Sequence, residues 1–306
     1  MSDTPRVYQS TDAGAPQLAG QPGSFASLMD AVLVDGYGAG PNARPGLGWM
    51  RAFTSLNKRV FRNDPASYSG CYIRFDDANA QYVLVDAYEA MSSTDTGSGR
   101  FSSTSNAWAK SNAASAATRS WICVGTARCV YVAIQMAGTG NWVGQFFGDT
   151  FPVVSTDHWN FMYTRSQSSA AYNPTTSLGM NITGYSSSIQ RSTDGVSGSA
   201  VCRAVSALFS NVNNWGSQGF PYPLHGLFGA LVSRGFFREG DVASGGPPRG
   251  YFPGLWLPEH NMSSIHAVGE VVSDLVPGAE VVAIATSGSN AANRIYLDIS
   301  NPWTSP

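Results

Sequence analysis

The chain has 306 residues, which is long enough to bury a substantial core, and 43% of them are apolar, which excludes global disorder. Its charged fraction of 12% is about half of the roughly 25% that is usual in globular proteins. The formal net charge is −2 and Lys and Arg form no cluster, so we expect no nucleic-acid partner.

Residues 1–23 are expected to form an extended N-terminal arm. The segment Met1–Arg6 is polar and lacks the basic and apolar regions of a secretory signal, so we expect synthesis in the cytoplasm and thiol cysteines. Gly and Pro recur from Gly14 to Gly23 at a density that opposes regular structure. Such an arm either frays or lies across a partner subunit, which makes Tyr8 a candidate contact residue.

A helix is predicted directly after the arm. Ser24 is a suitable N-cap, and Gly36 is placed to end the helix. Between them, apolar residues recur at the spacing that makes a single stripe on one helix face. The stripe consists of Phe25, Leu28, Met29, Val32 and Leu33. We expect this stripe to pack against a sheet rather than to bind a ligand.

The clearest strand signals lie between Gly70 and Gln135, where β-branched and aromatic residues dominate and Gly, Asp, Asn and Ser form the breaks. This pattern is typical of antiparallel hairpins. The four strands are expected at 71–75, 81–89, 121–124 and 130–135. Cys123 and Cys129 flank the turn before the last strand, so a disulfide across it is the alternative to free, half-buried thiols.

Two polar stretches interrupt the strand pattern. Ser92–Arg119 is rich in Ser, Ala, Thr, Asn and Gly, and we expect a long loop or an insertion at a sheet edge that could contain a short strand at Trp108–Ser111. The stretch 166–199 is rich in Ser and Thr and could mark a boundary within the domain. Residues 24–306 are otherwise expected to form a single mainly-β domain.

Strand-like patterns return in the last third, together with Pro-rich aromatic segments. The strands are expected at 201–205, 227–232, 268–272, 280–285 and 293–299. Pro at the frequency found in 220–224 and 251–258 excludes central strands, so we expect covering loops or an interface there. Trp and Tyr are enriched among interface anchors. The candidate interface residues are Tyr8, Tyr222, Tyr251, Phe252, Leu255 and Trp256.

Taken together, these elements predict a mainly-β fold. We expect antiparallel sheets in a β-sandwich-like arrangement, with one short N-terminal helix and long loops. The last strands, 280–285 and 293–299, could form an edge of one sheet with 268–272.

Motifs that carry chemistry are weak. The segment Gly195–Ser199 approaches Gly-x-Ser-x-Gly but ends in Ser, and a strand rather than a helix follows it. Zinc-site spacing is missing around the four histidines, which are His158, His225, His260 and His266. Among paired carboxylates, only Asp149 with Asp157 remains a candidate for glycan cleavage. We expect no enzyme, no cofactor and no metal site.

The first half of the chain carries a series of distinctive segments. They are Val7–Pro16, Gly23–Gly38, Gly48–Trp49 with Phe53, Asn57–Arg62, Cys71–Asp77, Tyr88–Met91, Asp95–Gly97, Trp108–Ser111 and Phe147–Asp149. In this order they resemble a family of tailed-bacteriophage virion proteins. The resemblance implies a structural protein of the tail or baseplate, encoded among the tail genes. The motifs of the family are not catalytic, so the resemblance implies no active-site residues.

The leading hypothesis is a non-enzymatic structural subunit of the tail or baseplate, located in the virion after synthesis in the host cytoplasm. Its partners would be other tail or baseplate proteins and further copies of itself. We expect no membrane insertion, because no apolar run is long enough to span a bilayer. The alternative is a receptor-binding module that recognises a host surface glycan or pilus through Ser/Asn-rich loops. A glycan hydrolase that uses Asp149 and Asp157 is the third hypothesis.

Overall fold

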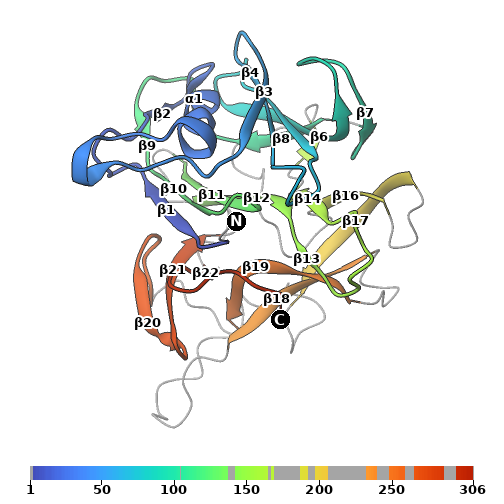
Figure 1. Cartoon of the computed structure of the whole chain (residues 1–306). Helices are drawn as coiled ribbons and strands as arrows, with labels where there is room; N and C mark the ends of the chain where they lie inside the picture. Colours follow the sequence, from blue (N-terminus) through green and yellow to red (C-terminus); the bar gives the residue numbers. More distant parts are fainter. Residues whose placement is uncertain are drawn as a thin grey trace.

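The computed structural model of the chain describes residues 3–103, 105–136, 142–164, 167–168, 187–191, 197–205, 232–239, 248–258, 265–285 and 294–305, and every structural statement below refers to them. This part of the chain is built mainly from antiparallel strands with one short α-helix (Figure 1), which confirms the predicted fold class. None of its helices is long and apolar enough to cross a membrane. The helical elements are α1 (Ser24–Asp30), a π-helical turn (Ala31–Asp35) and a 3₁₀ turn (Gly40–Asn42).

The larger of the two main sheets has 13 strands. Its order is β1-β10-β11-β12-β14-β16-β17-β18-β19-β22-β21-β20, with β13 paired to β19 beside this path. The strands are β1 (Arg6–Gln9), β10 (Trp121–Gly125), β11 (Cys129–Gln135), β12 (Trp142–Asp149), β13 (Phe151–Pro152), β14 (Phe161–Thr164), β16 (Ser187–Arg191), β17 (Ser197–Val205), β18 (Val232–Glu239), β19 (Pro248–Pro258), β20 (Val271–Val276), β21 (Ala279–Ala285) and β22 (Arg294–Asp298).

The smaller sheet has 7 strands in the order β15-β8-β6-β5-β4-β3, with β7 paired to β6. A separate pair joins β2 (Leu18–Ala19) to β9 (Thr118–Arg119). The strands of the smaller sheet are β3 (Met50–Ser55), β4 (Lys58–Arg62), β5 (Tyr72–Asp76), β6 (Tyr82–Met91), β7 (Gly97–Arg100), β8 (Asn106–Ala109) and β15 (Gln167–Ser168). The four strands expected between Gly70 and Gln135 are therefore present, but they are divided between the two sheets.

The sheets form three layers around two cores (Figure 1). The smaller sheet and α1 lie on one side of the strands β10, β11, β12 and β14, and the C-terminal strands β19, β21 and β22 lie on the other. Side chains of β11 alternate between the cores: Val130 and Val132 face the first, and Tyr131 and Ala133 face the second. Because both faces of these middle strands are buried, their sequences are continuous apolar runs.

The N-terminal segment predicted as an extended arm, frayed or lying across a partner subunit, is instead built into the domain. β1 pairs with β10, with Arg6 opposite Gly125 and Gln9 opposite Ile122. Tyr8 is buried in the first core, and its hydroxyl donates a hydrogen bond of 2.6 Å to the carbonyl oxygen of Pro45. Local Gly and Pro content did not reveal this strand, because its hydrogen-bond partners lie more than a hundred residues away in the chain.

The predicted helix is confirmed, but its N-terminus is capped differently from the expectation. Ser24 does not cap it; the Ser24 hydroxyl donates to the carbonyl oxygen of Ala19 at 2.7 Å. The cap comes from Asp77, whose Oδ2 accepts the backbone N–H groups of Phe25 at 2.8 Å and Ala26 at 3.0 Å. A carboxylate at this position satisfies orphan N–H groups and complements the helix dipole. The apolar stripe is buried in the first core, as predicted.

Asp77 also forms a buried ion pair with Lys110, and both side chains are fully shielded from solvent. Lys110 Nζ donates a second hydrogen bond, of 2.6 Å, to the carbonyl oxygen of Gln21. Burial raises the pKa of Asp77 and lowers the pKa of Lys110, while the attraction between the two charges opposes both shifts. This pair therefore ties together the start of α1, the turn after β5 and the residue that follows β8.

The polar stretch Ser92–Arg119 is not one long loop. It contains β7, β8 and β9, and all four residues of β8 are buried. β8 pairs with β6, and Trp108 within it donates a hydrogen bond of 2.9 Å from Nε1 to the carbonyl oxygen of Thr164. The short strand considered at Trp108–Ser111 thus exists in part. The loop expectation is wrong for this segment, because its small polar residues surround a strand that completes the core.

A central strand also occupies the Pro-rich segment 251–258, where we expected a loop. β19 pairs with β18 near both of its ends, with β13 near its start and with β22 toward its end. Pro248 and Pro258 lie at the two ends of β19, and Pro253 lies in a bulge, 252–255, that has no partner in β18. The prediction is wrong because a missing N–H group is tolerated at strand ends and in bulges.

The buried ion pair predicts that replacing Lys110 destabilises the protein more than replacing Lys58. Lys110→Met leaves the Asp77 carboxylate buried without a counter-charge, so we expect the free energy of unfolding to fall by about 3–5 kcal/mol. Lys58 is a matched control, because it pairs with Asp95 at the surface: the Lys58 side chain is exposed by 27% and the Asp95 side chain by 54%. Lys58→Met should cost about 1 kcal/mol or less. Urea denaturation measures both values.

A second variant separates charge from packing in the same experiment. Asp77→Asn combined with Lys110→Met removes both buried charges while the Asn oxygen can still accept from the helix N-terminus. We expect the double variant to be more stable than Lys110→Met alone. Equal losses for Lys110→Met and Lys58→Met would show that the buried pair is not a special constraint.

Candidate functional site

The candidate interface residues divide by burial. Tyr8, Phe252 and Leu255 are exposed by only 1%, 4% and 1%, so they belong to the protein's own cores and cannot act as surface contacts. Tyr251 and Trp256 are partly exposed on β19. Tyr222 lies outside the described residues. Two of the six candidates therefore lie at the surface, and the prediction of surface contact is wrong for three.

The two exposed candidates line a pocket of about 460 Å³ on β19. The guanidinium of Arg234 lies 5.4 Å from the centroid of the Trp256 ring, which is within the range of a cation–π contact. Trp303 lies against the backbone of Gly254 on the same side, where a Cβ would come within 2.2 Å of its indole nitrogen. Residues Phe252, Gly254 and Leu255 of the bulge in β19 line this hollow, which we call the β19 pocket.

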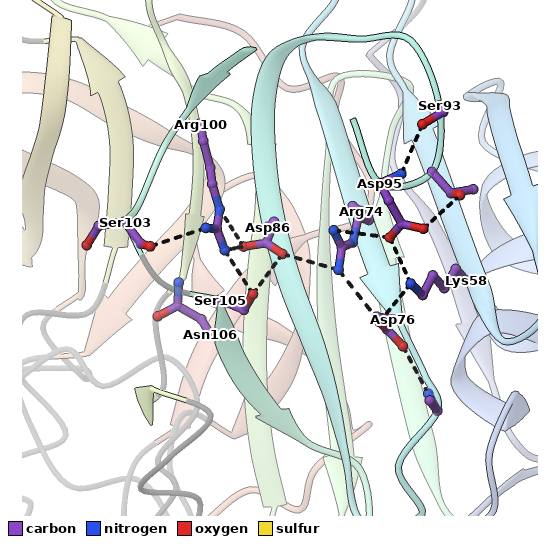
Figure 2. Close-up of polar contacts among 12 residues, drawn as sticks. Lys58, Arg74, Asp76, Asp86, Ser93, Asp95, Arg100, Ser103, Ser105 and Asn106 are labelled. Carbon is purple, nitrogen blue, oxygen red and sulfur yellow. Dashed lines mark hydrogen bonds and ion pairs between the residues drawn. The ribbon is translucent and has the colours of Figure 1, made fainter. Parts of the chain in front are cut away.

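A network of charged side chains crosses the outer face of the smaller sheet (Figure 2). Its six charged members come from β4, β5, β6, β7 and the loop between β6 and β7; they are Lys58, Arg74, Asp76, Asp86, Asp95 and Arg100. Lys58 Nζ lies 2.7 Å from Asp95 Oδ1 and 3.5 Å from Asp76 Oδ2. Arg74 contacts the carboxylates of Asp76 and Asp95, in each case at 3.6 Å.

The buried end of the network is Asp86. Its Oδ1 accepts hydrogen bonds from Arg100 Nη2 at 2.5 Å and Nε at 3.1 Å, and its Oδ2 accepts from Ser105 Oγ at 3.0 Å. At the exposed end, the hydrogen bond from Lys58 holds the pKa of Asp95 below its usual value. The network has three cations and three carboxylates, so its charges balance within the fold.

The balanced network holds the β6–β7 loop against the sheet, and it is a poor site for a metal ion. A hard cation needs several carboxylate oxygens that are not already neutralised. Here each carboxylate contacts Lys or Arg. Within the described residues, no group of three or more His, Cys, Asp or Glu side chains is placed to hold a metal ion.

The carboxylates considered for glycan cleavage have separate structural partners. Asp149 Oδ1 accepts from Ser69 Oγ at 2.6 Å and Oδ2 accepts from Ser69 N at 2.7 Å. Burial raises the pKa of Asp149. Asp157 is paired with Arg249, whose Nε and Nη2 donate to it at 2.8 and 3.2 Å. Both carboxylates are therefore buried, and each is bonded to its own partner within the fold.

The remaining sequence candidates are scattered. His158 is exposed in the loop between β13 and β14. His266 Nδ1 lies 3.1 Å from Glu270 Oε1, which lowers the pKa of Glu270. His225 and His260 lie outside the described residues, and so do the side chains of the serine-rich segment Gly195–Ser199.

The cysteines do not form the disulfide that was the alternative. Cys123 lies opposite Val132, and Cys129 lies opposite Gly148. Their side chains point into different cores, Cys123 into the first and Cys129 into the second. Both are free and fully buried rather than half-buried.

The sequence analysis did not predict the charge network or the buried pair of Arg249 with Asp157. Arg74 and Asp76 alternate along one strand and Asp86 lies on the next, so a period of two would have placed them on one face. Arg249 and Asp157, in contrast, are 92 positions apart and carry no local signal.

No model of a known protein family matches this chain, and no curated protein matches it.

Three thiols are predicted to react slowly in the native protein; Cys71 is partly buried, and Cys123 and Cys129 are buried. Burial raises the pKa of Cys71 to about 12, and at pH 8 such a thiol is ionised roughly a thousand times less than a thiol of ordinary pKa. Burial also raises the pKa of Cys123 and Cys129. We expect iodoacetamide at pH 8 to modify these three thiols slowly before unfolding and rapidly after it. Mass spectrometry of each cysteine peptide measures the ratio.

The same peptides test the alternative state. If Cys123 and Cys129 resist alkylation in denaturant until a reductant is added, they form a disulfide and the burial described here is incorrect. Rapid native alkylation of Cys123 would also contradict its position in the first core.

Proposed function

We propose that this chain is a non-enzymatic structural subunit of a bacteriophage tail or baseplate, located in the virion and bound there to other tail proteins and to further copies of itself. The observation that carries the proposal is the ordered resemblance of its first half, from Val7 to Asp149, to a family of tailed-phage virion proteins. That half also supplies the whole smaller sheet apart from β15.

The matching segments have structural tasks in the fold, which supports an architectural role. Asp77 caps α1 and pairs with Lys110. Gly148 has a φ of +123°, and a Cβ there would lie 2.4 Å from the Cα of Cys129, so only Gly fits. Asp149, next to it, fixes Ser69. Asp77, Gly148 and Asp149 thus serve to hold segments of the fold together.

The described part of the chain has exposed apolar side chains and a pocket that support a role in assembly. Leu56, at the β3–β4 turn, is exposed by 87%, and Val271, on the edge strand β20, by 50%. The β19 pocket presents Tyr251, Trp256 and Arg234 together. Aromatic residues and Arg are the types enriched at interface centres. We assign the β19 pocket as the surface that receives a neighbouring tail subunit.

The proposal predicts the location of the protein. Purified particles of the virus whose genome encodes this chain should contain it at a fixed copy number, as measured by quantitative mass spectrometry and by antibody labelling of tails. Its absence from intact particles, with the protein present only in the lysate, would overturn the proposal.

A substitution of Arg234 tests whether the β19 pocket is a contact surface. Arg234 is exposed and stacks on Trp256, so Arg234→Glu should leave folding intact and raise the dissociation constant for the neighbouring tail subunit or for self-association about 10-fold or more. Arg44→Glu is the matched control, because the Arg44 side chain is exposed by 49% and does not line the β19 pocket. Sedimentation velocity with both variants measures the effect. Equal behaviour of the two variants would exclude the β19 pocket as the contact.

A further inference from the structure

A second pocket, of about 380 Å³, opens where the smaller sheet and the loop between β13 and β14 diverge. It is distinct from the β19 pocket and shares no residue with it. One wall comes from residues before β5, from β6 and from the segment after β7, and the other comes from residues 158–161 and β16. The lining residues are Ser69, Cys71, Glu89, Phe101, His158, Trp159, Phe161 and Arg191.

The polar part of this pocket is a bidentate ion pair. Arg191 donates from Nε to Glu89 Oε1 at 2.5 Å and from Nη2 to Glu89 Oε2 at 2.9 Å. The guanidinium also lies 5.5 Å from the centroid of the Trp159 ring. A carboxylate has about four lone-pair sites, so the pair fixes the Glu89 carboxylate in one orientation and still leaves acceptor capacity toward the pocket.

Buried groups behind the pocket hold both walls in place. Arg249, exposed by only 2%, donates to the carbonyl oxygens of Arg191 at 2.6 Å and Trp159 at 3.0 Å while it is paired with Asp157. On the opposite wall, Asp149 binds both the backbone N–H and the hydroxyl of Ser69. The two carboxylates that the sequence suggested as a catalytic pair are therefore the supports of the two walls. A site fixed in this way binds without a large ordering cost.

The chemistry of the lining selects one class of ligand. Glu89 and Arg191 neutralise each other. An anion bound beside Arg191 would also lie beside the Glu89 carboxylate, and a cation bound beside Glu89 would also lie beside the Arg191 guanidinium. The pair therefore favours neither charged class. A purely apolar ligand would remove water from the ion pair without replacing the hydrogen bonds that the water makes, which is unfavourable. Trp159 is exposed by 37%, and Phe101 and Phe161 add apolar lining from the two walls.

A neutral sugar ring fits these requirements together. Its hydroxyl groups can bond to a carboxylate, a guanidinium and Ser69, and its weakly positive C–H face can pack on the negative face of an aromatic ring. The volume lies at the small end of the range of about 300–1,000 Å³ for ligand pockets, which suits one or two rings. We propose that the pocket formed by Glu89, Trp159 and Arg191 binds a neutral saccharide.

This inference goes beyond the structural role and does not depend on it. Saccharide binding is a property of the isolated chain, and it can be measured without particles. Failure of one proposal therefore leaves the other standing.

The test uses the purified full-length chain and a panel of methyl glycosides of glucose, galactose, mannose, N-acetylglucosamine and N-acetylgalactosamine with their β- and α-linked disaccharides. Glucuronate and sialic acid serve as acidic comparators. Saturation-transfer NMR detects binding, and titration calorimetry measures the dissociation constant. We expect at least one neutral glycoside to bind, and the acidic comparators to bind at least 10-fold more weakly.

Variants locate the binding. Trp159→Ala and Glu89→Gln should each weaken binding of that glycoside at least 10-fold, and Trp159→Phe should retain most of it. Trp256→Ala, in the β19 pocket, is the matched control and should bind as the unmodified chain does. Circular dichroism confirms that each variant is folded; Trp159 is partly exposed, so its replacement should not unfold the chain.

Three outcomes would overturn the proposal. They are binding of no neutral glycoside in the panel, preference for the acidic sugars, and binding that Trp159→Ala and Glu89→Gln leave unchanged.

Discussion

The ion pair between Asp77 and Lys110 is the constraint on which the arrangement of the first layer depends. Asp77 lies in the turn after β5, caps the N-terminus of α1 and faces the ammonium group that follows β8. A buried charge without a partner costs several kcal/mol, so each of these elements is held to the position that keeps the pair intact. Hydrophobic burial alone would allow α1 to slide over the sheet; the pair and the cap together specify one position.

The same use of charge recurs elsewhere in the fold. Asp149 is hydrogen-bonded to Ser69, and Asp157 forms an ion pair with Arg249. The network from Lys58 to Arg100 joins five chain segments through ion pairs. The chain has few charged residues, and in the described part many of them serve as internal supports. The proposed saccharide pocket arises next to these supports, where one pair, Glu89 with Arg191, remains at the surface.

Local patterns predicted the elements whose signals are local. The helix stripe from Phe25 to Leu33 and the strands around Ile73 and Val132 depend on periodicity and β-branched content, which are properties of neighbouring residues. The failures have one physical cause. Residues 6–9 are a strand because β10, more than a hundred residues away, supplies their hydrogen-bond partners. β8 pairs with β6, and β19 pairs with β18, β13 and β22, so pairing with other strands overrides the small polar residues of β8 and the prolines of β19. No local signal joins Glu89, Trp159 and Arg191.

The sequence by itself determined the class of the fold and the positions of its strongest helix and strands, because alternation and apolar runs fix which faces are buried. It also determined that charges are scarce and that Gly and Pro are frequent. Only the tertiary structure decided that these strands divide between two sheets, that Tyr8 is core rather than contact, and that Asp149 and Asp157 act as supports. The physical reason is that such roles are set by partners far away in the chain, 80 residues between Ser69 and Asp149 and 92 between Asp157 and Arg249.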